Sequence, residues 1–380
     1  MATAYANVNP DLLRWARERA DLSAGMLATK LQTTEDKVDA WESGEKKITM
    51  KQAMKLADKT FVPFGYFFLN EPPQEQLPIP DLRTLEGEPI QKPSAELYKI
   101  VQMVLARHEW YKEYLTGEDN QRLEFVDKFN LNSPVNQIVD DMRQFLRVEP
   151  HPTRGNWEDY LKSLIAKIEN LGIMVMREGY IGHHSRPLSV KEFRGFAIAD
   201  KKAPIIFINN ADAPAARLFT LVHELAHIWI GSTGVSNGAE HTHRQEEALC
   251  NAVAAEFLVP EIEFRDKWLN TDNWKDNMAP LEVHFKVSQW VLSRRALTLN
   301  FISREQYFSF ISYLKKQYDE RDKPSGGPSH WVTLKSQTSD RFARALLSET
   351  LSGKVLLRDA GQLLRVKPDK LKTFAKGYNF

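Results

Sequence analysis

The feature that most constrains this chain is an apolar helical segment that carries three ionisable side chains. Residues 213–230 are rich in Ala and Leu, and their spacing predicts a helix that ends at Gly231. The segment HELAH occupies residues 223–227 of this helix. Residues four apart share one face of a helix, so the two imidazoles project together, about one turn apart. Burying such polar groups is costly, so their presence in an apolar helix needs a chemical reason.

The spacing of the two histidines suits a metal ion. Two imidazoles one helical turn apart can reach one zinc ion at tetrahedral angles. Glu224 lies about 100° around the helix from His223, so it reaches the open side of the metal rather than the metal itself. There it can take a proton from water and pass it to a leaving amine. We therefore predict a Zn²⁺ site with His223 and His227 as ligands and Glu224 as the catalytic base, a donor set that also accepts Mn²⁺ or Fe²⁺.

A catalytic zinc ion takes three protein ligands and keeps one position open. The residue six positions after His227 is Thr233, which excludes the peptidase class with three histidines. The remaining candidates lie at or just before the next predicted helix, Arg244–Leu258: Glu246, Glu247, His241 and His243. The two carboxylates are the better candidates, because the two histidines fall in a polar loop where solvent-exposed side chains are expected. Two histidines and one glutamate on two helices would form a glutamate-type zincin site.

Composition excludes several classes of protein. A chain of 380 residues with 42% hydrophobic and 27% charged residues is typical of two or three globular domains. The net charge of +1 indicates no global basic field, so DNA binding would need a local surface. A single cysteine, Cys250, fits a reducing compartment. Residues 1–10 lack a secretory signal pattern, and the most apolar stretch, 218–230, is too short to cross a bilayer. We expect a cytoplasmic protein that does not bind membranes.

The remaining pattern predicts an α+β chain that is mostly helical. Short apolar runs predict a small three-stranded sheet: Gly172–Arg177, Phe193–Ala199 and Pro204–Asn209. Helical spacing and caps predict helices at Asp11–Ala20, Ser23–Leu31, Thr34–Glu42, Thr49–Lys59, Ser94–Leu115, Val135–Leu146, Asn156–Gly172, Pro280–Thr298 and Ser303–Lys316. An extended peptide would add to the edge of the sheet, and that edge is either Phe193–Ala199 or Pro204–Asn209.

Two regions of the chain are similar to known families. The HELAH segment, followed by EALCNAVAAEFLVP at 247–260, resembles the ImmA/IrrE metallopeptidases, and the likeness covers roughly residues 155–300. The family pattern has alanine and phenylalanine where this chain has Cys250 and Val253, and neither is a proposed ligand. The resemblance implies that Glu247 is the third ligand beside the two histidines, and that Glu224 is the general base.

Residues 8–69 carry the pattern LAxxL at 27–31, VxxWExG at 38–44 and LA at 56–57. They resemble an XRE-type (Cro/C1 repressor-like) helix-turn-helix domain, which presents its third helix to double-stranded DNA. That helix begins with acidic residues, which would repel phosphates. The side chains expected to contact phosphate are basic ones nearby: Lys30, Lys37, Lys46 and Lys47. The alternative is a helix-turn-helix retained as a protein-docking surface.

These patterns predict four parts of the chain: a helix-turn-helix domain at 1–70, a linker and helical connector at 71–155, a zincin-like metallopeptidase domain at 156–320 and a small helical C-terminal module at 330–380. The chain resembles fusions of the two modules found among prophage, mobile-element and toxin–antitoxin-like genes. The resemblance implies a regulatory zinc endopeptidase that cleaves a repressor, an antitoxin or another regulatory protein. The alternative is a non-catalytic transcriptional regulator or antitoxin that uses the zincin-like domain as a sensor or docking scaffold. Either protein could form an oligomer.

Overall fold

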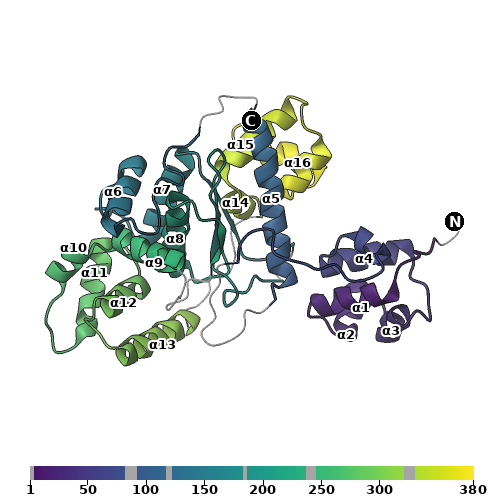
Figure 1. Ribbon diagram of the computed structural model, residues 1–380, viewed down its shortest axis with the longest axis horizontal. Helices are drawn as coiled ribbons and strands as arrows, with labels where there is room; N and C mark the ends of the chain where they lie inside the picture. The colour runs from purple at the N-terminus through teal and green to yellow at the C-terminus, as the bar shows by residue number, and fades with distance from the viewer. Residues whose placement is uncertain (1–3, 82–91, 117–121, 183–185, 237–244, 321–329) are drawn as a thin grey trace. The chain divides into compact units, whose positions relative to one another are not determined.

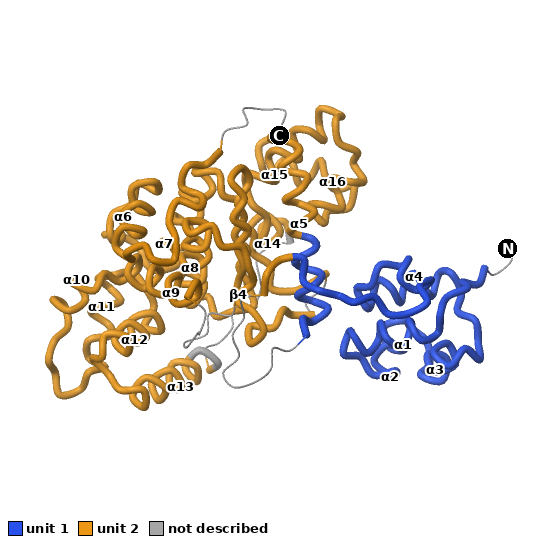
Figure 2. The backbone as a smooth tube through the Cα atoms, viewed as in Figure 1, with its two compact units in different colours: residues 1–78, 91–103 blue, residues 79–90, 104–380 orange. Residues whose placement is uncertain are grey.

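The computed structural model describes residues 4–81, 92–116, 122–182, 186–236, 245–320 and 330–380. The chain divides into two compact units, shown in different colours in Figure 2: the first holds residues 1–78 and 91–103, and the second holds residues 79–90 and 104–380. Within the described ranges, every helix is either too short or too polar to cross a bilayer.

The first unit is a set of short helices. They are α1 (Pro10–Arg19), α2 (Ala24–Leu31), α3 (Glu35–Glu42), α4 (Met50–Thr60), the 3-10 helix η1 (Phe64–Phe68) and the first part of α5 (Ala95–Thr116). The four predicted helices are confirmed to within one or two residues. Side-chain caps set the starts of α2 and α4: Ser23 accepts a hydrogen bond from the Met26 amide, and Thr49 forms a capping box with Gln52.

A buried ion pair joins the first and third helices of this unit. Glu42 is 4% exposed, and both of its carboxylate oxygens accept hydrogen bonds from the Arg17 guanidinium at 2.8 Å. The Glu42 backbone carbonyl also accepts a bond from Arg14 at 3.0 Å. A bidentate pair of this kind fixes the relative orientation of its two side chains as well as stabilising the fold. The Arg17–Glu42 pair therefore fixes the position of α3 relative to α1.

The second unit is a small sheet with helices on both faces (Figure 1). Its strands are β1 (Met174–Glu178), β2 (Gly195–Ile198), β3 (Ile205–Asn209) and β4 (Gly234–Ser236). Its helices are the rest of α5, α6 (Val135–Leu146), α7 (Trp157–Asn170), η2 (Pro214–Ala216), α8 (Arg217–Trp229), α9 (Gln245–Leu258), α10 (Glu261–Lys267), η3 (Trp274–Asn277), α11 (Met278–Phe285), α12 (Gln289–Thr298), α13 (Arg304–Glu320), α14 (His330–Gln337), α15 (Asp340–Leu351), α16 (Leu357–Leu364), η4 (Pro368–Lys370) and α17 (Leu371–Lys376).

The strand order of the sheet is β1-β3-β2-β4. β3 pairs in parallel with β1 and antiparallel with β2, and β2 pairs antiparallel with β4. The expected fold class is therefore confirmed, but the prediction of three strands was wrong by one. The predicted edge strands were also wrong, because β2 and β3 are both interior and β4 is an edge. β4 is three residues long and has no alternating pattern of its own, so only its pairing with β2 reveals it.

A short segment of the chain lies on the outer side of β4. The amide of Val235 donates a hydrogen bond to the Pro80 carbonyl at 3.0 Å, and Asp81 forms an isolated parallel bridge with Val235. Ile79, just before them, is 6% exposed. Residues 79–81 thus extend the sheet by one short strand-like segment, which we call the edge segment.

The two faces of the sheet carry different contacts. Gly195 and Ala197 of β2 face α8, so Phe196 faces the other way, where it stacks on Phe207 of β3 with ring centroids 4.7 Å apart. Figure 1 shows α6 to α9 on one side of the sheet and α14 to α16 on the other. The predicted helix Pro280–Thr298 is in fact two helices, because Lys286 adopts a left-handed conformation (φ 55°) and ends α11.

A buried charge cluster ties α5 and the C-terminal helices to β1. Arg107 of α5 is 1% exposed, and its Nη1 lies 3.1 Å from Oε1 of Glu178. Its Nε donates to the Leu363 carbonyl at 2.9 Å, and Arg365 pairs with the other oxygen of Glu178. Removing one partner from such a cluster leaves an uncompensated charge in the interior.

We expect Glu178→Ala to destabilise the protein by about 3 kcal/mol or more, because Arg107 would stay buried without its counter-ion. Lys316→Ala is the control, since Lys316 and Glu320 form an exposed pair whose loss should cost under about 1 kcal/mol. Urea unfolding of the two variants measures both values, and equal midpoints would contradict the structural role of the cluster.

Candidate metal centre

The helix α8 is buried along most of its length and is held at its C-terminal end. Its C-terminal carbonyls accept hydrogen bonds from the amides of residues 127–129, and the Trp229 indole donates to Asp141 at 2.8 Å. The chain leaves the helix at Gly231, whose φ of 69° lies in the left-handed region that glycine tolerates. The predicted end of the helix is therefore confirmed. Its predicted start at 213 is a 3-10 turn, η2, and α8 itself begins at Arg217.

Three side chains from α8 and α9 converge inside the core. The Nε2 atoms of His223 and His227 are 3.2 Å apart. Oε2 of Glu247 lies 3.4 Å from His223 Nε2, and Oε1 lies 3.2 Å from His227 Nε2. Ligand atoms around a tetrahedral zinc ion with bonds of about 2.0–2.1 Å are about 3.3 Å apart. The three side chains therefore already have the mutual spacing of a zinc ligand set, and each is no more than 2% exposed.

Glu224 lies beside this cluster without belonging to it. It is 0% exposed, and its Oε1 accepts a short hydrogen bond from the Ser236 hydroxyl of β4. Among the described residues, its buried Oε2 has no hydrogen-bond partner. The backbone of β2 leaves room for this carboxylate, because a Cβ atom at Gly195 would lie 2.7 Å from Glu224 Oε1. A glycine at this position thus allows the sheet to approach the glutamate closely.

The pKa values of Glu224 and Glu247 are shifted in opposite directions. Burial raises the pKa of Glu224 to about 8, although His223 and the Ser236 hydrogen bond oppose the increase. Burial also acts on Glu247, but hydrogen bonds from His223 and His227 outweigh it and hold its pKa at about 2. Glu247 is therefore ionised where it faces the histidines, while Glu224 can gain or lose a proton near neutral pH.

The structure distinguishes between some of the candidate third ligands. Glu247 points into the cluster, and Glu246, one residue earlier on α9, is not part of it. His241 and His243 lie outside the described residues. Thr233 has another role: its hydroxyl accepts a hydrogen bond from the Ala199 amide at 2.9 Å, which fastens the turn after α8 to the end of β2.

Sequence reasoning missed two residues of the site. Ser236 holds one oxygen of Glu224, and Gly195 provides the space for that side chain. A serine outside any recognisable motif carries no signal of such a role. A glycine inside a predicted strand does indicate a close approach of another group, and FRGFAIA contains one.

The donor set fits a divalent transition metal. Two imidazoles and one carboxylate with an open side are typical of catalytic zinc sites. The Nε2 atoms of the two buried rings lie 3.2 Å apart, and both face the carboxylate of Glu247. Burying two imidazoles and two carboxylates together in a core is costly unless an additional group compensates them. A bound cation would compensate the carboxylates and accept the Nε2 lone pairs of both rings.

The first unit presents both charge signs around α3. Lys37, Lys46 and Lys47 are exposed, and Lys30 is half-buried at the end of α2. The exposed acidic residues Glu35, Asp36 and Asp39 lie on α3 itself. Lys37 therefore lies on the acidic helix itself, and the other three lysines lie before or after it in the chain.

Comparisons with known families agree with these two regions. The family model of the IrrE N-terminal-like domain, a peptidase family, matches residues 168–297. The chain carries an IrrE-like domain. A helix-turn-helix model matches residues 13–67, and a domain of unknown function (DUF8813) matches residues 338–377. No curated protein matches the chain. The resemblance to an IrrE-type peptidase fused to an XRE-type helix-turn-helix is therefore confirmed, and the IrrE-like domain includes α8 and α9.

We expect Glu247→Gln to lower the bound zinc by one equivalent per chain, because it removes the negative ligand between the two histidines. Glu246→Gln is a matched control one residue away, and it should retain the wild-type zinc content. Metal analysis after dialysis measures both. Equal zinc contents would show that Glu247 is not a ligand.

Proposed function

We propose that the IrrE-like domain is a zinc-dependent endopeptidase centre, with His223, His227 and Glu247 as ligands and Glu224 as general base and acid. The observation that supports this most directly is the state of Glu224. A site built only to hold a structural metal would need ligands and no further carboxylate. Here a fully buried fourth ionisable group lies beside the three. Ser236 holds one of its oxygens, and the other has no partner in the part of the chain that the structure describes.

In the proposed mechanism, a bound metal ion and Glu224 carry out different steps of peptide hydrolysis. A zinc ion held there would polarise the scissile carbonyl and make an adjacent water more acidic. Glu224 Oε2 takes the proton of the attacking water, and the same carboxyl then delivers a proton to the leaving amine. Ser236 keeps Oε1 occupied, so the proton moves through Oε2 alone. A nearby dication would lower the pKa of Glu224 from its raised value, and the carboxylate would then accept the proton as a base at neutral pH.

An extended substrate would align along β4, the edge strand that also carries Ser236. Backbone hydrogen bonds to a sheet edge align a peptide without regard to its side chains. The edge segment, residues 79–81, already uses the outward amide of Val235. A substrate that pairs with β4 therefore has to displace the edge segment first.

The neighbouring helix-turn-helix domain supports a regulatory role. A peptidase domain in one chain with a DNA-binding type of domain is suited to act on few substrates, and we propose that these are repressors, antitoxins or other regulators of transcription. The alternative role, as a non-catalytic regulator, gives no use for a carboxylate buried beside the three proposed ligands.

We expect Glu224→Gln to retain zinc and lose proteolysis by about 10²–10⁴-fold, the usual contribution of a general acid–base group. The amide keeps the shape and the Ser236 contact but cannot accept a proton. The substrate search compares new protein N-termini in cells that produce wild type, Glu224→Gln or the Glu246→Gln control. Fragments found with wild type and the control but absent with Glu224→Gln identify substrates, and full cleavage by Glu224→Gln would refute the mechanism.

For the helix-turn-helix, we expect a salt-sensitive gel shift with DNA from the chain's own upstream region, because exposed lysines release counterions from phosphates. Lys46→Gln with Lys47→Gln should weaken the shift on all sequences and lower the salt slope by about one for each phosphate that is no longer neutralised. Lys315→Gln with Lys316→Gln, two exposed lysines in the other unit, serves as the charge-matched control. The absence of any shift at low salt would favour a protein-docking surface.

A further inference from the structure

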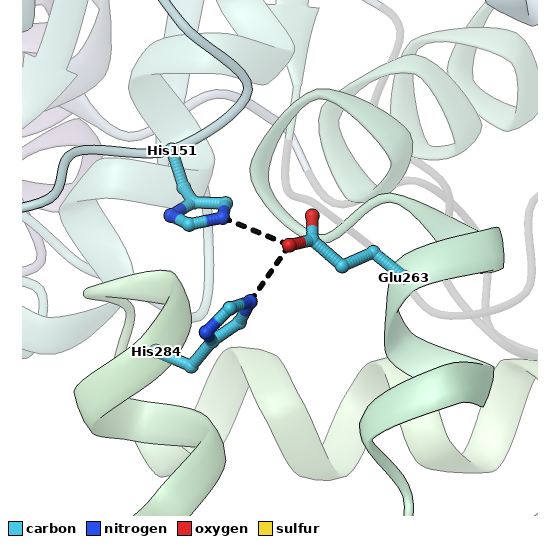
Figure 3. Close-up of side chains that lie close together, drawn as sticks. All are labelled: His151, Glu263 and His284. Atoms are coloured by element: carbon cyan, nitrogen blue, oxygen red, sulfur yellow. Dashed lines mark hydrogen bonds and ion pairs between the residues drawn. The ribbon is translucent and has the colours of Figure 1, made fainter.

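A second group of metal-ligating side chains lies outside the centre described above. His151, in the loop between α6 and α7, and His284, on α11, both point at Glu263 on α10 (Figure 3). Nε2 of His151 lies 3.0 Å from Glu263 Oε1, and Nε2 of His284 lies 2.7 Å from the same oxygen. The proposed function gives these three residues no role.

We propose that His151, Glu263 and His284 form a second transition-metal site, with Zn²⁺ as its natural occupant. The donor set is the same as in the first cluster, two imidazoles and one glutamate. In both clusters the ligand atoms lie within 4.8 Å of one another. Imidazole and carboxylate donors together suit zinc and its neighbours in the first transition series, and they are a poor match for calcium or magnesium, which prefer oxygen ligands alone.

The surroundings of this site hold the ligands in place. The rings of His151 and His284 are 4.5 Å apart, and both pack against the buried Phe285 at 5.6 Å and 4.8 Å. Phe285 in turn packs on the buried Phe264, which follows Glu263 on α10. The two histidines thus pack on an aromatic cluster, which limits the movement of their rings.

The site differs from the first cluster in its access to solvent. The side chains of His151, Glu263 and His284 are 17%, 31% and 30% exposed, whereas the first cluster is closed. His151 also lines a surface hollow of about 430 Å³. A metal here keeps water in its remaining positions and exchanges with bulk solution more readily than a metal in the core. The ligands come from three separate elements, so the ion would cross-link the α6–α7 loop with α10 and α11. Of these, α10 directly follows α9, the helix that carries Glu247.

The test isolates the second site in the full-length chain. His223→Ala removes a ligand of the first cluster, and the metal-free variant is then titrated with Zn²⁺ against a chromophoric chelator and, separately, with Co²⁺. We expect one equivalent of either ion, visible d–d absorption from bound cobalt and a higher melting temperature with zinc. Because the first cluster is disabled, this result does not depend on whether the chain is a peptidase.

Ligand variants in the same background decide the assignment. Glu263→Gln keeps the size of the side chain but removes a proposed ligand. Loss of a group that only supports a ligand typically weakens metal binding ~10–100-fold, and we expect a larger loss of zinc affinity here. Glu261→Gln, two residues earlier on α10 and half-buried, should bind zinc as the parent does. His151→Asn and His284→Asn provide the same measurement if Glu263→Gln folds poorly by circular dichroism.

Two results would overturn the proposal. One is a folded His223→Ala protein that takes up no zinc at about 100 µM, a concentration at which a His₂Glu set should be filled. The other is equal zinc affinity in Glu263→Gln and Glu261→Gln. Either result would leave the three residues as a hydrogen-bonded link between the α6–α7 loop, α10 and α11.

Discussion

Four ionisable side chains lie together in the core of the IrrE-like domain, and the cost of burying them shapes what surrounds them. His223, His227 and Glu247 compensate one another across 3.2–3.4 Å, which keeps the glutamate ionised without contact with water. Glu224 has weaker compensation, and its pKa rises accordingly. The rest of the site serves this arrangement: α9 delivers Glu247, β4 delivers the Ser236 hydroxyl, and Gly195 leaves space for Glu224.

Much of the fold follows from local signals in the sequence. Helices that start at a good cap were predicted closely, as at Ser23, Thr49 and Asn156, because capping is decided by a few adjacent residues. The break between α11 and α12 was missed because Lys286 adopts a left-handed conformation without being glycine or asparagine. β4 was missed because a three-residue strand exists only through its partner.

The candidate site shows the same division between local and non-local information. HELAH specified its helix and two of the converging side chains, since their spacing is a property of one helix. Spacing alone left Glu246 and Glu247 as equal candidates, because the angle at which α9 meets α8 is a matter of tertiary packing. The second His–Glu cluster had no sequence signal at all, since its residues are 21 to 133 positions apart in the chain. The role of each residue as a ligand remains a prediction, and so do the four domain boundaries.

The edge segment has a thermodynamic consequence for selectivity. Its Pro80 carbonyl competes for the Val235 amide at an effective concentration set by the chain itself, which dilution does not lower. A peptide that pairs with β4 binds with its intrinsic affinity reduced by the fraction of molecules in which that edge is free. Short peptides that offer only backbone hydrogen bonds gain little against such a competitor. A folded partner that makes further contacts elsewhere on the chain binds tightly enough to displace the edge segment. The edge segment therefore makes selectivity depend on how much surface a substrate contacts, rather than on the residues beside the cleaved bond.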